Sequence, residues 1–375
     1  MEQQFIDQAV AHYRALLESQ VQRAKRMNQA QEAREKREKI IIGTAGGDGI
    51  GPIITRQAQR ALEALLREEI AAGKIELREI QGLTLEDRMA AGQAVPTKTL
   101  AQIKACDVLL KGPTTTPSGG AMESANVTLR RELDLFANVR PVSVPEKGID
   151  WTFFRENTEG EYALGSKGVE LPGLLTMDFK VTTVAGTRRI ARAAFEFARQ
   201  NGKKHLAIVT KSNIMKKTDG MFSALCHEMA KEYPEIETEE YYIDIMTANL
   251  VNKAVRKKFQ VFLLPNLYGD ILTDEAAQLQ GGVGTAGSAN LGDRYAMFEA
   301  IHGSAPRMME SGLGDYANPE SILRAAVMLL RHIGLAEKAQ RLSHAIDQAA
   351  LFPMTGDANG ATCAQFGDAV LRKLG

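Results

Sequence analysis

Short apolar runs alternate with amphipathic helical patterns along most of this sequence. The first run, residues 40–42, consists of three isoleucines, precedes a glycine-dense turn and leads into a helical pattern over residues 53–70. Further strand candidates are residues 75–80, 108–110, 151–154, 205–210 and 261–264, and helical patterns between them include residues 186–199 and 321–334. Strands that alternate with helices predict an α/β architecture with a largely parallel sheet.

The first 39 residues differ from the rest of the chain. Residues 2–39 contain neither Gly nor Pro, and apolar residues recur at helical spacing from Phe5 to Met27, which predicts one long amphipathic helix. Its second half, from Arg23 to Lys39, mixes basic residues with Glu and favours a solvated face. Its apolar stripe needs a partner, either the same subunit or another one, and we favour a role in joining dimers.

Composition excludes several classes of protein. The 375 residues suggest two domains or one large one, and 46 basic residues balance 46 acidic ones, which disfavours nucleic acid as a partner. No apolar run of 18 residues predicts a membrane span, and the N-terminus lacks the pattern of a secretory signal. A mitochondrial transit peptide is a rival for the Arg-rich N-terminus, but its acidic residues argue against one. Three distant cysteines predict buried thiols, and we expect a cytoplasmic protein.

Two glycine-rich segments carry different weight. Residues 282–287 match the GxGxxG spacing of a Rossmann dinucleotide site, but residues 274–279 read as helix and 288–293 as loop, so the required strand before and helix after are missing. Residues 46–52 follow a strand and open a helix. They are either a ligand-binding loop or an ordinary turn between the two elements.

Charged residues of two kinds suggest chemistry. Residues 266–270 read as the end of an apolar strand, and Asp274 follows Asp270 by four residues at the start of a helix. This spacing puts both carboxylates on one face, where they would bind Mg²⁺ or Mn²⁺ or merely complement a helix dipole. Arginine binds carboxylates through two parallel hydrogen bonds, and four arginines fall in a short span of the chain. They are Arg130, Arg131, Arg140 and Arg155, and each is either a substrate ligand or a solvated surface residue.

Together these segments resemble the β-decarboxylating dehydrogenase family, which includes isocitrate, isopropylmalate, homoisocitrate and tartrate dehydrogenases. The resemblance covers residues 40–375. Its motifs are GDGIGP at 47–52, KGP at 111–113 with TTP at 115–117, LFANVRP at 135–141, RENTEGEY at 155–162, Lys211 with NIMK at 213–216, residues 266–274, and HGSAP at 302–306. Their combined order and spacing are highly specific.

The resemblance implies an α/β, isocitrate/isopropylmalate dehydrogenase-like two-domain fold that is not a Rossmann fold, with an extra N-terminal helix. Residues 1–39 would form this extension, 40–135 and 281–375 the large domain, and 136–280 a small domain with dimer-forming elements. The active site would lie in the cleft between the domains and be completed by a second subunit. The protein would therefore be a homodimer or a higher homo-oligomer that acts on a small molecule.

The resemblance also implies roles for individual residues. Arg130, Arg140 and Arg155 would hold the substrate carboxylates. Asp270 and Asp274 would bind Mg²⁺ or Mn²⁺ together with Asp244 of the neighbouring subunit, which would also supply Lys211. Tyr162 would protonate the enolate left by decarboxylation, and Lys211 would carry the proton of the substrate hydroxyl. Thr210 departs from the family, where many members have His before this lysine.

Substrate and nucleotide preferences follow from two further segments. Ser124 and Asn126 resemble the polar pair of isocitrate dehydrogenases, whereas isopropylmalate enzymes have apolar residues there, so isocitrate is the favoured substrate. Ser124 could also be only a helix cap. Arg307 could bind a 2′-phosphate, but residues 354–360 look more like those of NAD enzymes, so NAD is favoured over NADP. The implied nucleotide-binding residues are Thr115, Asn213, Glu299, His302, Gly303, Ser304, Ala305, Arg307 and Asn318.

Two alternatives stay open. Another β-decarboxylating 2-hydroxy acid dehydrogenase, for homoisocitrate, isopropylmalate or tartrate, would use the same catalytic set. A noncatalytic regulatory subunit is expected to lack some of the catalytic or metal-binding residues, yet Tyr162, Lys211, Asp244, Asp270 and Asp274 are all present.

Overall fold

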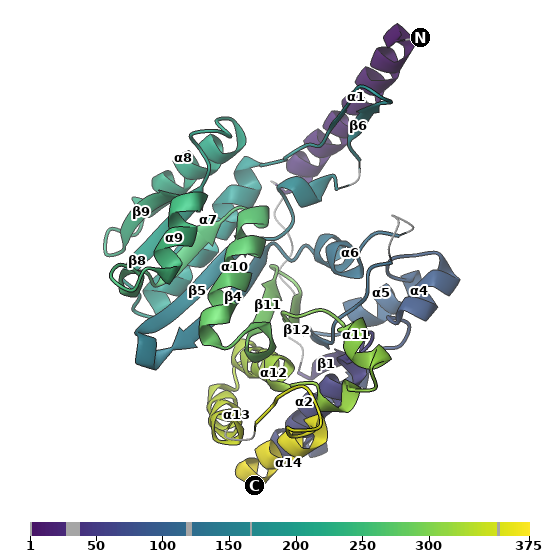
Figure 1. Cartoon of the computed structure of the whole chain (residues 1–375), viewed down its shortest axis with the longest axis vertical. Coiled ribbons are helices and arrows are strands. Elements are labelled where there is room, and N and C mark those ends of the chain that lie inside the picture. The colour runs from purple at the N-terminus through teal and green to yellow at the C-terminus, as the bar shows by residue number, and fades with distance from the viewer. Residues whose placement is uncertain (1, 28–37, 118–121, 166, 351–352) are drawn as a thin grey trace. The chain divides into compact units, whose positions relative to one another are not determined.

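A computed structural model describes residues 2–27, 38–117, 122–165, 167–350 and 353–375 (Figure 1). The chain divides into two compact units. Unit 1 contains residues 1–33 and 145–275, and unit 2 contains residues 34–144 and 276–375. The N-terminal helix thus groups with unit 1, although the sequence suggests a separate extension.

The sheet of unit 2 mixes parallel and antiparallel strands. Its order is β2 (Ile75–Glu79), β1 (Ile40–Ala45), β3 (Val108–Lys111), β12 (Ala296–Ala300), β11 (Gly287–Leu291) and β4 (Ala137–Val144). The first four strands run parallel, whereas β11 is antiparallel to both β12 and β4. Because of this strand order, segments that are far apart in the sequence lie at the same part of the sheet.

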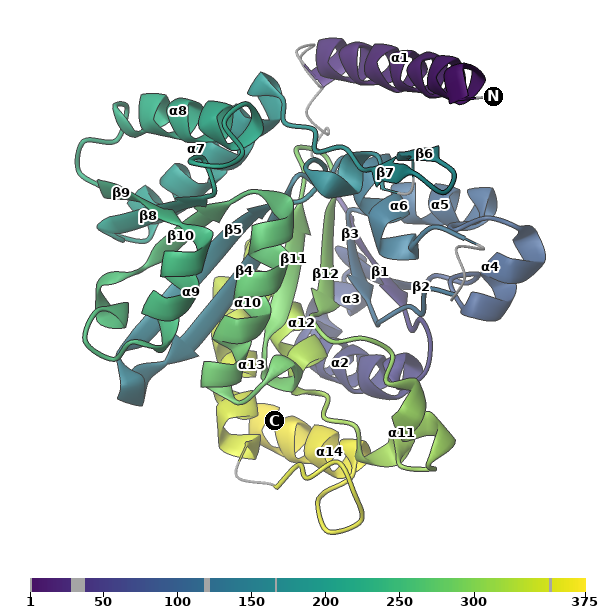
Figure 2. The same cartoon turned by 45° about the horizontal axis from the view of Figure 1, so that its top comes forward.

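Helices cover both faces of this sheet (Figure 2). On one face lie α2 (Gly51–Leu65), α12 (Glu320–His332), α13 (Ala336–Ala349) and α14 (Cys363–Leu374). On the other lie α4 (Leu85–Ala91), α5 (Thr97–Lys104) and α6 (Ala125–Glu132), which pack on a core that includes Leu109, Leu129 and Met297. Burial at helical spacing, as for Ile322, Ala326 and Leu329 in α12, explains why these segments form helices. The short helices α3 (Arg67–Ala71) and α11 (Pro306–Glu310) complete the unit.

Unit 1 has a sheet of four parallel strands. Its order is β5 (Ile149–Glu156), β10 (Val261–Leu264), β8 (His205–Thr210) and β9 (Glu237–Tyr242). Helices α7 (Val184–Gln200) and α8 (Thr218–Ala230) cover one face, and α9 (Ile243–Val251) and α10 (Asn266–Gln280) lie on the other (Figure 2). The central strand β10 is wholly buried and apolar, as expected for a parallel strand covered on both faces. A small hairpin joins β6 (Val169–Leu171) and β7 (Leu175–Met177).

Helix α1 (Glu2–Met27) packs against β6 and α7 of unit 1. Among the residues of α1 whose burial is described, Leu16 alone is buried, and the ring of Tyr13 lies 5.2 Å from that of Phe179. The sequence predicts that the first half packs and that the charged part from Arg23 stays solvated. Within this single chain Val10 and Leu17 remain half-exposed, so packing of the first half on another subunit stays a prediction, whereas Arg23, predicted to be solvated, is partly buried in an ion pair. Residues 28–37 of the predicted helix lie outside the described part of the chain.

Most predicted elements are confirmed, including the strands at 205–210 and 261–264. Two local predictions are wrong. Residues 266–270 begin helix α10 rather than ending a strand, because the chain turns directly after Leu264. Residues 288–293, expected as a loop, mostly belong to strand β11, whose small and polar residues hid it from a search for apolar runs. None of the described helices is long and apolar enough to cross a membrane.

Candidate active site

Unit 2 contains a small polar cavity at the ends of its central strands. Its volume is about 140 Å³. The lining residues are Pro113, Thr114, Asn126, Arg130, Arg140, Ser288, Glu299, Ala300, Ile301, His302 and Gly303. Six of them, Asn126, Arg130, Arg140, Glu299, His302 and Gly303, are predicted site residues. Ser124 is not among the lining residues; it stands at the N-cap of α6 without a side-chain cap hydrogen bond.

Strand register aligns buried polar side chains beside this cavity. Lys111 of β3 is paired with Glu299 of β12, and Asn138 of β4 is paired with Asn290 of β11. The Asn138 amide donates to Ser288 Oγ at 2.8 Å and to Asn290 Oδ1 at 2.9 Å. Asn290 in turn donates to Glu299 Oε1 at 2.8 Å. The result is a continuous hydrogen-bonded row across four strands, which fixes its members' orientation.

The two arginines of the cavity are attached to the ends of this row. Arg140 Nε donates to Asn138 Oδ1 at 2.8 Å, and Arg130 Nη2 lies 3.2 Å from Glu299 Oε1. Burial raises the pKa of the Glu299 carboxyl, but the charges of Lys111 and Arg130, with hydrogen bonds from Asn290 and Lys111, lower it to about 2. Glu299 is therefore an ionised counter-ion that orients Arg130. The Glu299 carboxylate that contacts Arg130 is thus the same group that was predicted to bind the nucleotide.

Two polar atoms of the cavity-lining residues lack a hydrogen-bond partner in the described chain. They are Arg130 Nε and His302 Nε2, and both are buried. Burial lowers the pKa of His302, whose Nδ1 lies 2.9 Å from the Gly303 carbonyl. A buried donor without a partner is costly. Arg130 Nε is such a donor, whereas His302 Nε2 is an acceptor, because the neutral ring carries its proton on Nδ1 toward the Gly303 carbonyl. The guanidinium edge suits a carboxylate of a ligand, and the imidazole acceptor suits a ligand hydroxyl.

The glycine-dense turn at 46–51 packs on two other predicted segments of unit 2. A Cβ on Gly47 would lie 2.1 Å from the Pro113 carbonyl oxygen, and one on Gly49 would lie 2.1 Å from that of Ser304, so only glycine fits. Asp48 accepts from the Thr115 amide at 2.8 Å, and Thr115 Oγ1 lies 2.7 Å from Ser304 Oγ. Thr115 and residues 302–305 therefore form one compact cluster. Arg307 is exposed on α11, and Asn318 accepts from the Glu320 amide.

In unit 1, the predicted residues follow the carboxyl ends of parallel strands. Arg155 is near the end of β5, Lys211 follows β8, Asp244 follows β9 and Asp270 follows β10. Because parallel strands end at the same edge of a sheet, the topology places these four segments at one edge. Asn213 also belongs to unit 1, where it is exposed, whereas the other predicted nucleotide-binding residues belong to unit 2.

Asp270 is the centre of one group in unit 1. Its carboxylate accepts from Arg155 Nη1, and its Oδ2 accepts from the Tyr162 hydroxyl at 2.9 Å. Asn266 Oδ1 accepts from Arg155 Nε at 2.9 Å and Nη2 at 2.6 Å, which fixes the guanidinium. A Cβ on Gly269 would lie 2.5 Å from Arg155 Cγ, so the glycine lets the buried arginine pass α10. One carboxylate therefore connects the predicted substrate ligand with the predicted proton donor.

Asp270 and Asp274 are one turn apart in α10, as their spacing predicts. The Asp270 side chain is 41% exposed, and Asp274 is also exposed. Their oxygens are the hard donors that Mg²⁺ and Mn²⁺ prefer, so the donor chemistry fits a divalent ion. Within the described residues of this single chain, no three His, Cys, Asp or Glu side chains gather into a metal-binding group.

Lys211 and Asp244 form a pair in the same unit. Lys211 Nζ lies 2.6 Å from Asp244 Oδ1, and this hydrogen bond is the main cause that lowers the pKa of Asp244. The backbone amide of Lys211 donates to Asp219 Oδ2 at 2.8 Å. The preceding Thr210 donates to Glu240 rather than to Lys211. Lys211 and Asp244 are therefore expected to act as a pair.

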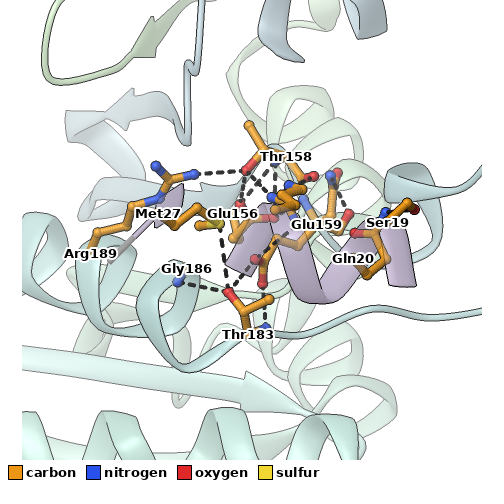
Figure 3. Close-up of polar contacts among 11 residues, drawn as sticks. Ser19, Gln20, Met27, Glu156, Thr158, Glu159, Thr183, Gly186 and Arg189 are labelled. Atoms are coloured by element: carbon orange, nitrogen blue, oxygen red, sulfur yellow. Dashed lines mark hydrogen bonds and ion pairs between the residues drawn. The ribbon is translucent and has the colours of Figure 1, made fainter. Parts of the chain in front are cut away.

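Two buried acidic residues, Glu156 and Glu159, follow Arg155 and precede Tyr162 in the sequence, and neither was predicted as a site residue. Figure 3 shows both side chains. Glu156 accepts from the Thr158 amide and hydroxyl and from the Glu159 amide, at 2.6–3.1 Å. Burial and the nearby Glu159 raise the pKa of Glu156 to about 7, although hydrogen bonds from Thr158 and the charge of Arg189 oppose the shift. Asn138 and Asn290 were missed too. The signal in the sequence was a polar residue within a strand, because such a residue is buried only when its hydrogen bonds are satisfied.

Comparisons with known proteins agree with this geometry. The family model described as isocitrate/isopropylmalate dehydrogenase matches residues 41–370. The NADP isocitrate dehydrogenase of Rickettsia bellii is 41% identical over 313 residues, which are 81% of this chain and 62% of the relative. The probable NAD isocitrate dehydrogenase subunit alpha, mitochondrial, of Caenorhabditis elegans is 38% identical over 85% of this chain and 88% of the relative.

A solved structure is also similar. The crystal structure of isocitrate dehydrogenase from Methylococcus capsulatus superposes with a TM-score of 0.80 at 34% identity, covering 89% of this chain and 99% of that chain. The present chain spans about 62% of the length of the Rickettsia relatives.

Proposed function

Because the chain belongs to the isocitrate/isopropylmalate dehydrogenase family, we propose that it catalyses the oxidative decarboxylation of isocitrate. The products would be 2-oxoglutarate, CO₂ and NAD(P)H. The observation that carries this proposal is the polar cavity of unit 2, lined by Asn126, Arg130 and Arg140. A substrate with three carboxylates suits two oriented guanidinium groups and an amide.

Arg130, Arg140 and Arg155 would bind the carboxylates. Glu299 and Asn138 support this role because they hold Arg130 and Arg140 in place before substrate arrives. Asn266 does the same for Arg155. Asn126, whose amide oxygen accepts from Thr114 at 3.2 Å, would distinguish isocitrate from substrates with an apolar group at that position.

Asp270 and Asp274, with Asp244 of a second subunit, would hold Mg²⁺ or Mn²⁺. Such an ion, when bound, supplies Lewis acidity to the hydroxyl and carbonyl oxygens of the substrate. Lys211, as the unprotonated amine, would take up the hydroxyl proton through Nζ, and Asp244, whose Oδ1 lies 2.6 Å from Nζ, would stabilise the ammonium that forms. Tyr162 would donate its hydroxyl proton to the carbon that loses the carboxylate.

Thr115 and residues 302–305 would bind the nucleotide, which would supply the hydride acceptor for the reaction. We favour NAD over NADP. A Cβ on Gly356 would lie 4.0 Å from Met308 Cε of α11, and Asp357 follows Gly356 in the chain. The Asp357 carboxylate accepts from Thr355 Oγ1 at 2.7 Å and from the Asn359 amide at 2.9 Å, and these bonds lower its pKa. A single arginine is weaker support for binding a 2′-phosphate than a cluster of cations, so NAD is favoured.

The first experiment is an initial-rate assay with isocitrate and Mn²⁺, run with NAD and with NADP. We expect nucleotide reduction and 2-oxoglutarate formation, faster with NAD. Isopropylmalate, homoisocitrate and tartrate are the comparison substrates. Faster turnover of any of these would replace isocitrate as the substrate, and no turnover of any would favour a regulatory subunit.

A second experiment tests the substrate specificity. Asn126→Leu should lower kcat/KM for isocitrate by roughly 100-fold, because a polar substrate group would lose its partner in the cavity. Ser124→Leu serves as a comparison on the same helix and should have a smaller effect, because Ser124 is outside the cavity lining. Equal rates for native and Asn126→Leu protein would remove the basis for the isocitrate assignment.

A further inference from the structure

The N-terminal helix, which lies outside the family match, contacts the segment between Arg155 and Tyr162. Arg23 Nη1 lies 3.3 Å from Glu159 Oε1, and Arg23 Nη2 donates to the Thr158 carbonyl at 3.3 Å and to Thr158 Oγ1 at 3.4 Å. The Glu159 side chain is only 3% exposed. A residue of α1 therefore supplies a cationic partner for a buried carboxylate.

The need for this partner follows from the surroundings of Glu159. Its carboxylate accepts from the Thr183 amide at 2.8 Å and from the Thr183 hydroxyl at 2.5 Å, at the first turn of α7 (Figure 3). Glu156, a second buried carboxyl, lies three residues earlier in the chain. Two buried carboxyl groups so close together repel each other when both are ionised. A buried charge is stable only when it is paired and hydrogen-bonded.

A chain of hydrogen bonds leads from this point to the proposed catalytic group. The Glu159 carbonyl accepts from Asn266 Nδ2 at 3.1 Å, and Asn266 Oδ1 binds the guanidinium of Arg155. Arg155 binds Asp270, which also accepts from Tyr162. The backbone of residues 156–162 connects the same two side chains directly. The position of Glu159 is thus coupled to both Arg155 and Tyr162.

We propose that Arg23 is a positioning residue for the active site: it holds Glu159 and the Thr158 carbonyl, and thereby fixes the segment that carries Arg155 and Tyr162. The helix α1 is then part of the catalytic unit, not only an appended element. This inference rests on the proposed function, because Arg155 and Tyr162 have their roles there.

The test compares Arg23→Met with Arg26→Met in the full-length protein. Both variants lose one positive charge from the last turns of α1, but Arg26 is exposed. For Arg23→Met we expect a higher KM for isocitrate and a lower kcat, with a combined fall in kcat/KM of about 10- to 100-fold. The KM for the nucleotide should not change, because the residues of the Thr115 and 302–305 cluster belong to unit 2. Arg26→Met should behave like the native enzyme, and Arg23→Lys should restore part of the activity.

A double-mutant cycle with Glu159→Gln separates positioning from general destabilisation. If Arg23 acts through Glu159, the loss in the double variant is clearly smaller than the product of the two single losses. Native kinetics in Arg23→Met, an equal loss in Arg26→Met, multiplicative losses in the cycle, or a parallel change in the nucleotide KM would each overturn the inference. An inactive native protein would refute the proposed function instead, so the two failures are distinguishable.

Discussion

At the scale of single residues, Asp270 has more than one task, because it accepts hydrogen bonds from Arg155 and Tyr162 while its side chain stays partly exposed. Asp270→Asn keeps the volume and removes the charge. We expect turnover to fall by at least about 100-fold, more than is typical when only an outer-shell residue of a metal site is lost. Circular dichroism should show an unchanged fold. Stimulation by Mn²⁺ should be lost.

The matched comparison is Asp293→Asn, which removes a carboxylate from the exposed turn after β11 and should leave turnover unchanged. If Asp270→Asn retained full activity with native dependence on Mn²⁺, the assignment of Asp270 to the metal would be wrong.

Glu156 gives a prediction about pH. Its pKa is raised from 4.5 to about 7 in the folded protein, so between these values the folded state binds more protons than the unfolded state. The contribution of Glu156 to the free energy of unfolding therefore falls as pH rises through this window. In Glu156→Gln that dependence is absent. The stability of the variant relative to native protein should rise between pH 4.5 and 7, by on the order of 1–3 kcal/mol.

Denaturant unfolding at several pH values measures this difference. Glu240→Gln is a comparison variant, because the contribution of Glu240 to the free energy of unfolding should depend on pH with the opposite sign. Burial raises the pKa of Glu240, but hydrogen bonds from Ser223, Thr210 and Ser212 outweigh it and lower the pKa below 4.5. Its contribution is present above pH 4.5 and is lost as pH falls through the folded pKa. A relative stability of Glu156→Gln that stayed constant from pH 4.5 to 7 would mean that Glu156 does not titrate in this window.

At the scale of elements, the start of α10 shows how a helix can be shaped by one buried side chain. Gly269 lies in the first turns of α10, and a Cβ there would lie 2.5 Å from Arg155 Cγ and 2.6 Å from its Cβ. Ala is normally better than Gly in a helix by about 1 kcal/mol. At this position we expect the opposite, because overpacking against the buried arginine costs about 1–3 kcal/mol. Gly269→Ala should lower the melting temperature and raise the KM for isocitrate.

Gly220→Ala is the matched control, because Gly220 lies in α8 and a Cβ there would meet no atom within 4 Å. That variant should be as stable as the native protein or more stable, with native kinetics. The same substitution thus has opposite expected signs in two helices. A Gly269→Ala protein that is both stabilised and fully active would show that Arg155 can move aside.

The extent to which the sequence predicts these elements depends on how each one is buried. Apolar runs revealed β8 and β10 with their observed bounds, because both strands are covered by helices on two faces. Strand β11 has the sequence GSANL and was missed, since its Ser288 and Asn290 are buried in hydrogen bonds with Asn138 rather than by apolar contact. Such satisfaction depends on partners from other strands, about 150 residues away in the chain.

The candidate site was also predicted only in part. The family resemblance implied Arg130, Arg140 and Asn126, which line one cavity, and Asp270 and Tyr162, which form one hydrogen-bonded group. It did not identify Glu156, Glu159 or Asn266 as a network, because their meaning depends on contact with α1 and α7. Arg23 was expected to be solvated, since a run of mixed charge looks the same whether or not one member meets a buried carboxylate.

At the scale of the whole molecule, α1 presents a stripe of apolar residues that its own subunit leaves partly uncovered. Ile6, Val10, Tyr13, Leu17 and Val21 are each exposed by 39–55%. Their spacing of 4, 3, 4 and 4 residues places them along one side of the helix. It is also nearly symmetric about Tyr13, so an antiparallel copy of α1 would set Ile6 against Val21 and Val10 against Leu17. A self-complementary stripe of this kind suits a two-fold contact with a second copy of the chain.

The prediction is that this stripe joins dimers into a larger assembly. Deleting residues 1–35 would test it, but the deletion would also remove Arg23 and so confound assembly with activity. The double substitution Val10→Glu with Leu17→Glu keeps Arg23 and a good helix former at each position. Light scattering should show a larger mass than a dimer for the native protein and a dimer for this variant, because two charges in an apolar contact are costly. Its kinetics should remain native.

The control variant, Gln8→Glu with Gln22→Glu, adds the same charge to exposed positions outside the stripe and should leave the mass unchanged. If native protein and the Val10/Leu17 variant have the same mass, the stripe does not join subunits, and the contacts of α1 within unit 1 are its structural role.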